Sequence, residues 1–312
     1  MTDGKRSAFE KFAWFTLGYN LLVILWGVFL RASHSGDGCG QHWLTCQGEV
    51  IPSAPQLKTI IEFSHRITTA IAGIVVLVLV VWAFRAFEKR HWVRKAAVLS
   101  LLFIVFEALI GRGLVLTGNT ADNWTPTRPY WTAGHLINTF ILLAFLTLTA
   151  WCAGNGGTPK LNRPAKIWIL MLIGLSAILF VGVSGSMGAL ANMLFPSTTL
   201  SEGLAKDFDP SSNGLLRLRI SHPILSVLTA VYLVFLSGWL SRWGGGRQAI
   251  KRWSNRLTIL VILQIAFGAA TLLMLAPIVM QLGHLLLADL IWIAFILLTA
   301  NFLSAGDETQ IS

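Results

Sequence analysis

Four of the seven histidines lie inside long apolar runs and repeat at fixed distances along the chain. His65 and His222 are 157 residues apart, and His135 and His284 are 149 residues apart. An ionisable side chain at membrane depth is costly, so it usually marks a function. Two facing imidazoles in a helix bundle can bind a haem iron from both sides. The repeated histidines therefore predict two bis-histidine haem sites, one in each half of the chain.

Other uses of these histidines fit the sequence less well. A zinc site needs three or four ligands, and the apolar runs supply no cluster of cysteines or carboxylates to complete one. A proton path needs a chain of acidic groups, whereas only Glu62, Glu107 and Asp289 lie inside the runs. A lone histidine more often serves as a hydrogen-bonding contact between helices, but that interpretation does not explain the repeat.

Glu62 distinguishes the two halves. It precedes His65 by three positions, so the two side chains share one face of a helix. Arg219 occupies the corresponding position before His222. A carboxylate beside a bound haem could transfer protons or steer an oxidation. The alternative is a structural ion pair with a nearby arginine (Arg31, Arg66 or Arg112).

The elements that must position these residues are membrane-spanning. Of the 312 residues, 54% are apolar and only 12% are charged, whereas soluble domains carry about 25% charged residues. This excludes a soluble enzyme, a disordered protein and a disulfide-stapled secreted domain. The formal charge of +10 comes from short basic clusters between apolar runs, so no nucleic-acid partner is expected.

Eight apolar runs are long enough to cross a bilayer, which takes about 20 residues. They are continuously apolar rather than alternating, which favours helices over a barrel. The predicted spans are residues 12–31, 59–84, 96–117, 130–153, 166–190, 216–241, 256–277 and 281–304. The expected fold class is therefore an all-α integral membrane protein with eight transmembrane helices.

Lysine and arginine are divided unequally between the two sides of the membrane. The side that holds the N-terminus and every second loop carries 16 of the 24. The positive-inside rule then places both termini in the cytoplasm. The long loops, at about residues 32–58, 118–129 and 191–215, face outward, and we expect the chemistry toward the outer half of the membrane.

The order of features predicts an internal repeat. Glu107 and Gln264, in the third and seventh spans, are also 157 residues apart. Four spans per half keep both halves in the same orientation, which is a parallel repeat about an axis along the membrane normal. We expect two tandem four-helix bundles, formed by residues 1–157 and 158–312 and related by a pseudo-two-fold axis.

Two cysteines lie seven residues apart in the first outer loop. On the oxidising side of a membrane, Cys39 and Cys46 would form a disulfide that closes a small loop. The disulfide could brace the loop, or it could serve a redox or cofactor-transfer role. Cys152, near the cytoplasmic end of the fourth span, is expected to be a packing residue.

These residues resemble the haem A synthase family, which includes the bacterial enzyme and its mitochondrial relative. The resemblance covers essentially the whole chain. It rests on three further histidines in register (His135, His222 and His284) and on four local motifs: Glu-Phe-Ser-His-Arg at 62–66, Leu-Thr-Gly at 116–118, the cysteine loop at 38–48, and Ile51-Pro52.

The resemblance implies a reaction and a division of labour. The reaction is oxidation of the C8 methyl of haem O to the formyl group of haem A, for terminal oxidase biogenesis. It would proceed by successive hydroxylations to a geminal diol that loses water. The resemblance assigns His222 and His284 to the iron of a haem b cofactor and His65 and His135 to the iron of the substrate haem O, with Glu62 as the catalytic residue.

The expected partners follow from that reaction. A haem O synthase would supply the substrate, and membrane lipid would surround the helices. No Rossmann or flavin fingerprint is present, so electrons would come from another protein or from the quinone pool. The expected location is the bacterial cytoplasmic (inner) membrane, and assembly into a homo-oligomer stays open.

Two features depart from the family pattern. Many bacterial members carry a second cysteine pair in the outer loop between spans five and six, whereas residues 191–216 contain none. Glu107 stands where a neutral amide such as Gln264 is expected. The competing functions are a non-catalytic dihaem b-type cytochrome and a haem transporter. Both account for the histidines, but the cytochrome accounts for neither the Glu62 asymmetry nor the cysteine loop.

Overall fold

The described part of the chain is all-helical. The computed structural model describes residues 3–120, 122–154, 158, 160, 162–245 and 247–305. Its helices, in chain order, are α1 (Asp3–Ala32), α2 (Leu57–Ala86), α3 (Trp92–Leu116), α4 (Arg128–Ala153), α5 (Ala165–Leu194), α6 (Leu200–Phe208), α7 (Gly214–Arg219), α8 (Ser221–Trp243), α9 (Gln248–Leu273) and α10 (Ile278–Ser304).

The eight predicted spans are confirmed. Within the described residues, eight helical segments are long and apolar enough to cross a membrane, and the sixth comprises α7 and α8 together. The chain is therefore a multi-pass membrane protein. Most predicted ends differ from the observed ends by a few residues, because polar and basic residues at the membrane surface continue the helices past the apolar runs.

Two details differ from the prediction for a physical reason that involves proline. The sixth span is divided at Ile220, because Pro223 has no N–H to donate to the carbonyl of Arg219. The seventh span ends at Leu273 rather than at residue 277. Leu275 and Ala276 adopt left-handed backbone angles just before Pro277, which disfavours a helical conformation in the residue that precedes it.

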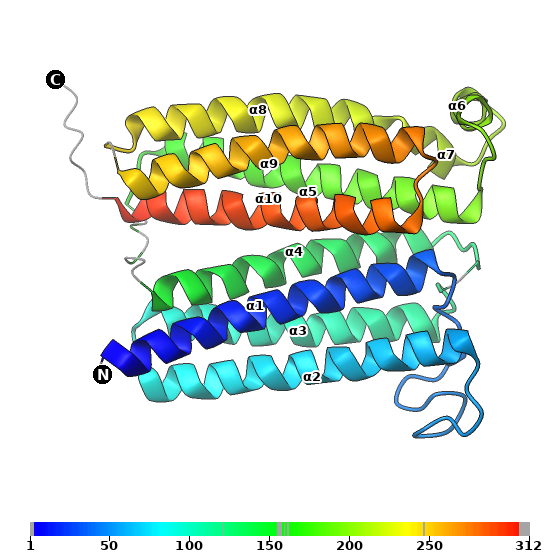
Figure 1. The fold of residues 1–312 in the computed structure, drawn as a ribbon, viewed down its shortest axis with the longest axis horizontal. Helices are drawn as coiled ribbons and strands as arrows, with labels where there is room; N and C mark the ends of the chain where they lie inside the picture. Colours follow the sequence, from blue (N-terminus) through cyan, green and yellow to red (C-terminus); the bar gives the residue numbers. More distant parts are fainter. Residues whose placement is uncertain are drawn as a thin grey trace.

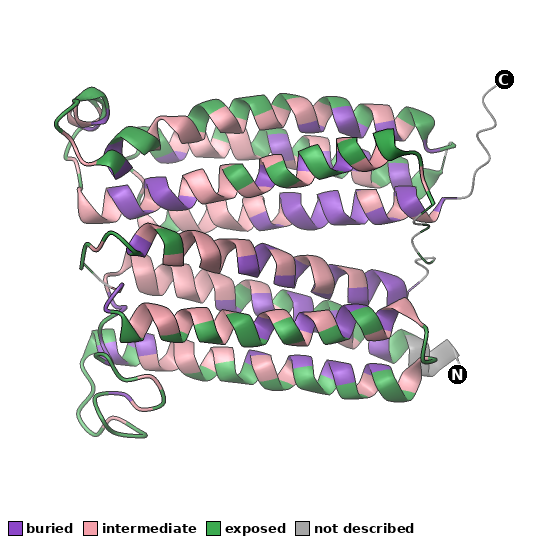
Figure 2. Ribbon diagram, turned by 180° about the vertical axis from the view of Figure 1, so that it is seen from behind, coloured by how far each residue is buried: buried purple, intermediate pink, exposed green. Residues whose placement is uncertain are grey.

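The spanning helices form two groups that lie side by side (Figure 1). One group contains α1 to α4, and the other contains α5 and α8 to α10. Helices α4 and α10 meet between the groups, and they carry many of the buried residues in Figure 2. Across this contact Trp292 Nε1 donates to the carbonyl of Phe140 at 2.7 Å, and the two rings stack with centroids 5.1 Å apart.

The outward faces of the other spans are apolar and exposed. Examples are Ile74 on α2, Leu109 on α3, Val227 on α8 and Leu263 on α9. Lipid tails are as apolar as these side chains, so a bilayer solvates such faces without cost. The predicted boundary between the halves falls in a connection whose residues 155–157 lie outside the described residues.

The four candidate histidines gather at one end of the molecule. All four lie within the first nine residues of their helices, which are α2, α4, α8 and α10. These four helices begin at the end that carries the long connections and α6, whereas α1 begins and α10 ends at the opposite end (Figure 1). The four candidate histidines thus lie at the end of the molecule that the distribution of basic residues predicts to face outward.

Candidate functional site

The histidine pair of the second half has a geometry that suits a metal ion between the rings. The ring centroids of His222 and His284 are 6.2 Å apart, and the ring planes are nearly perpendicular at 86°. Bonds between imidazole nitrogen and a metal are about 2 Å long. The spacing therefore agrees with two imidazoles that bind one iron from opposite sides.

Glycines fix the positions of three histidine rings. A Cβ added at Gly185 or at Gly268 would lie 2.8 Å from a ring carbon of His222 or His284, respectively. A Cβ added at Gly27 would lie 2.9 Å from His65 Cε1. Only glycine permits such a close approach, so helices α1, α5 and α9 each provide a surface against which one ring packs.

The first half carries the other two histidines at the same end of the molecule. His65 lies near the start of α2, and His135 lies near the start of α4. Nδ1 of His135 lies 2.9 Å from Oε1 of Glu107, which is an ion-pair distance, although the contact lacks the angle of a well-aligned hydrogen bond. The structure thus places His135 beside the carboxylate whose role the sequence left unexplained.

Several ring nitrogens lack the partners that buried polar atoms normally have. Nδ1 of His65 and Nδ1 of His284 are buried, and neither has a hydrogen-bond partner in the described part of the chain. By contrast, Nδ1 of His222 lies 3.1 Å from Ser184 Oγ, which leaves Nε2 as the free nitrogen. The paired rings of the second half, the glycines beside three of the rings and the unpartnered nitrogens suit histidines that bind haem.

Glu62 is buried and pairs with Arg66, one of the three arginines that the sequence offered. Arg66 Nε donates to Glu62 Oε1 at 3.1 Å, and its Nη2 contacts the same oxygen. Glu62 Oε2 accepts from the backbone N–H of Cys39 at 2.8 Å. The carboxylate is therefore held in one orientation, between α2 and the cysteine loop.

The predicted disulfide is confirmed. Cys39 and Cys46 are joined, and both are buried. Arg66 also holds this loop in place, because its Nη1 donates to the carbonyls of His42, Trp43 and Thr45 at 2.6, 3.2 and 3.0 Å. Cys152 is a buried free cysteine, as expected for a packing residue.

The second half secures its outer loop without a disulfide. Arg219, at the position that corresponds to Glu62, donates from Nε to Asp207 Oδ1 at 2.8 Å and from Nη2 to the carbonyl of Gly203 at 3.0 Å. It also contacts Asn192 on α5. An ion pair thus ties α6 to α7 in a loop that contains no cysteine.

Neither α6 nor the role of Asp207 was predicted from the sequence. The signal was present as a capping box: the hydroxyl of Thr199 accepts from the backbone N–H of Glu202 at 3.2 Å. The pKa of Glu202 is lowered to about 2, because Lys206 and Thr198 donate hydrogen bonds to its carboxylate. A short, polar helix produces no apolar run, so hydropathy does not reveal it.

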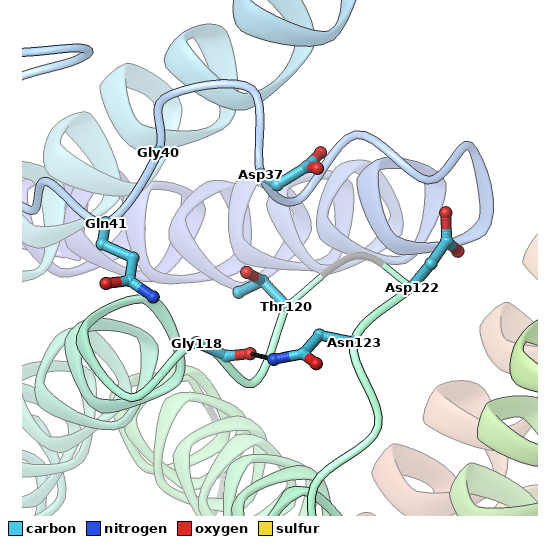
Figure 3. A pocket seen from close by; sticks show the side chains of 7 residues that line it. All are labelled: Asp37, Gly40, Gln41, Gly118, Thr120, Asp122 and Asn123. Atoms are coloured by element: carbon cyan, nitrogen blue, oxygen red, sulfur yellow. Dashed lines mark hydrogen bonds between the residues drawn. The ribbon is translucent and has the colours of Figure 1, made fainter.

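A separate cavity of about 280 Å³ lies between two of the long loops (Figure 3). Asp37, Gly40 and Gln41 line it from the cysteine loop, and residues 118, 120, 122 and 123 line it from the loop after α3. Asn123 Nδ2 closes part of that loop by donating to the carbonyl of Gly118 at 2.7 Å. No histidine lines this cavity, so it is distinct from the candidate haem sites.

Residues 10–296 match the family COX15-CtaA, which is described as cytochrome oxidase assembly protein. The chain belongs to the COX15-CtaA family. It is 43% identical over 295 residues to a "Protoheme IX farnesyltransferase" of Thermus thermophilus, a match that covers 95% of this chain and 48% of that protein. It is 30% identical over 284 residues to "Heme A synthase" of Halalkalibacterium halodurans, covering 87% and 89% of the two chains.

A third relative extends the comparison. "Heme A synthase" of Alkalihalophilus pseudofirmus is 28% identical over 248 residues, which cover 78% of this chain and 79% of that protein. The chain spans about half the length of the Thermus relative. The COX15-CtaA region, residues 10–296, contains all the predicted site residues: Cys39, Cys46, Glu62, His65, His135, His222 and His284.

Proposed function

We propose that this COX15-CtaA chain is a haem A synthase, which oxidises the C8 methyl of haem O to the formyl group of haem A. The observation that carries the proposal is the asymmetry of two similar histidine sites. Each site has two histidines near the outer membrane surface, but only the first has a buried carboxylate, Glu62, three residues before a ligand. This asymmetry suits one resident haem and one haem that reacts.

The second half, residues 158–312, would hold haem b through His222 and His284. When bound, this haem supplies electron transfer to or from the substrate site. Ser184 orients His222 through Nδ1, and Gly185 and Gly268 set the positions of the two rings. The described side chains of this half would thus hold and orient the haem. Arg219 binds Asp207 in the loop and does not contribute to the haem site.

The first half, residues 1–157, would receive haem O through His65 and His135. Glu62 shares a helix face with His65, so its carboxylate lies on the side of α2 from which the substrate is held. Its hydrogen bond to Cys39 and its ion pair with Arg66 fix its orientation. In this position Glu62 accepts or returns a proton during oxidation of the methyl group.

A haem O synthase is the proposed partner. The matched Thermus protein bears the name of a protohaem farnesyltransferase, and about half of its length aligns with this chain. A haem-modifying activity joined to this domain would place the product of one step beside the next. We place both termini on the cytoplasmic side and the haem sites toward the outer side, with electrons from a separate protein or the quinone pool.

Product analysis tests the proposal. Cells that express this chain together with a haem O synthase should accumulate haem A or its hydroxylated precursor, as measured by haem extraction and chromatography. Glu62→Ala should abolish that product while haem b is retained. Unchanged haem O beside a folded, haem b-containing protein, with an electron donor supplied, would contradict the proposal and favour a dihaem cytochrome or a transporter.

A further inference from the structure

Glu107 is a largely buried carboxylate to which the proposed reaction gives no role. Its side chain is 13% exposed on α3, and its contacts come from α4. Oε1 lies 2.9 Å from Nδ1 of His135 and accepts a hydrogen bond from Thr139, and Oε2 accepts a hydrogen bond from Asn138. A single carboxylate is therefore held by three side chains, one of which is a candidate haem ligand.

The corresponding residue in the second half makes a different contact. Gln264, 157 residues later on α9, places its amide nitrogen 3.4 Å from Nε2 of His284. Among the described residues, neither Gln264 Oε1 nor His284 Nδ1 has a hydrogen-bond partner. Glu107 therefore places a negative charge beside the Nδ1 atom of a candidate haem ligand, whereas the corresponding Gln264 is neutral.

This difference has a chemical consequence for a bound iron. With Nδ1 of His135 facing the carboxylate, Nε2 is the nitrogen left to bind metal. A carboxylate that accepts the Nδ1 proton fixes the tautomer and ring orientation of a histidine ligand and makes that ligand more basic. Axial ligands and their hydrogen bonds are among the factors that set haem reduction potentials.

We propose that Glu107 is a positioning residue that holds His135 through Nδ1 and gives the first-half haem a lower reduction potential than a neutral residue would. The proposal rests on the assignment of His65 and His135 as ligands of that haem. It predicts that the two haem sites, which both have two histidines, differ in the electron donation of an axial ligand because only the first site has the charge of Glu107. A stronger axial donor stabilises ferric over ferrous iron at the site where the substrate is oxidised.

The alternative is a purely structural role, in which Glu107 only braces α3 against α4 through Asn138 and Thr139. However, Asn138 also donates to the carbonyl of Phe103 at 2.9 Å, so one link between these helices remains without Glu107. Glu107→Gln should therefore fold, and it removes the charge while it preserves the size of the side chain.

The test uses the 312-residue chain purified with its haem b and titrated with iron protoporphyrin IX. The first-half haem is identified as the added haem whose binding is lost in His135→Ala. Potentiometric titration and the electron paramagnetic resonance spectrum of the ferric state are then compared among variants. Glu107→Gln should raise the reduction potential and shift the ferric signal of the first-half haem, and Glu107→Asp should restore part of both changes.

Thr139→Val is the matched control, because it removes a hydrogen bond to the same carboxylate but keeps the charge beside His135. It should leave the potential unchanged. A Glu107→Gln protein whose first-half haem keeps the wild-type potential and ferric signal would overturn the role of Glu107 alone. A wild-type protein without His135-dependent haem binding would overturn the ligand assignment, and the present proposal with it.

Discussion

A glycine opposite a histidine ring recurs at three of the four candidate ligands, on α1, α5 and α9. A side chain at any of these positions would occupy the space of the ring, since the nearest ring carbon lies within 2.9 Å of the added Cβ. The position of each of these rings therefore depends on the absence of a side chain on the neighbouring helix as well as on the histidine itself. The fourth candidate ligand, His135, instead has Oε1 of Glu107 2.9 Å from its Nδ1 atom.

Gly185→Ala should displace His222 and lower the haem b content of the purified protein severalfold. The added Cβ would meet the ring at 2.8 Å, whereas at Gly188, one turn further along α5, the nearest atom of another residue is 3.7 Å away. Gly188→Ala is therefore the matched control and should retain its haem. Haem per protein is measured by the pyridine haemochrome spectrum, and a fully loaded Gly185→Ala protein would contradict the account.

Among the elements, each half fastens its first long connection to the span that carries a histidine. In the first half the disulfide, Glu62 and Arg66 do this, and in the second half Arg219 and Asp207 do it. The charge at the corresponding position is reversed between the halves, which leaves a carboxylate near the site only in the first half.

Asp207→Asn should release α6 from α7. The Asp207 side chain is 8% exposed, and loss of one partner of such a buried pair costs about 3 kcal/mol or more. Because 1.4 kcal/mol corresponds to a factor of about ten, limited proteolysis between residues 196 and 213 should accelerate at least tenfold. Asp209→Asn is the control, since Asp209 bonds locally to Ser211, and equal proteolysis of both variants would argue against the ion pair as the fastening.

At the scale of the whole molecule, the two groups of helices meet along α4 and α10. Asp289 lies one turn before Trp292 on α10, so it shares the face that contacts α4. It is fully buried, and neither carboxylate oxygen has a hydrogen-bond partner among the described residues. A buried carboxyl group without partners destabilises the contact in which it lies.

Asp289→Leu should therefore raise the free energy of unfolding by about 1 kcal/mol or more, because an apolar side chain of similar size replaces the unpartnered group. Thermal unfolding in detergent, followed by tryptophan fluorescence, measures the change. Leu298→Ala, a truncation of a fully buried residue on the same helix, should instead lower stability. A destabilised Asp289→Leu protein would mean that the carboxyl group has a partner in the membrane.

The sequence predicted what is periodic or strongly apolar, and it missed what depends on contacts between distant residues. Hydropathy located the eight spans, and spacing alone located the histidines near one end of their helices. The sequence offered three arginines as ion-pair partners for Glu62, and only the fold identifies Arg66 as the partner. The contact between Glu107 and His135 joins two helices, so no local pattern could have revealed it. The short helix α6 depends on its caps instead of an apolar run.

We propose that one half holds haem b and that the other half holds the haem that reacts. The most direct measurement compares His65→Ala with His284→Ala in cells that also make haem O, with bound haem b and extracted haem A quantified for each. His65→Ala should keep haem b and lose the product, whereas His284→Ala should lose haem b. Loss of haem b in His65→Ala, with haem b retained in His284→Ala, would reverse the assignment of the halves and contradict the account.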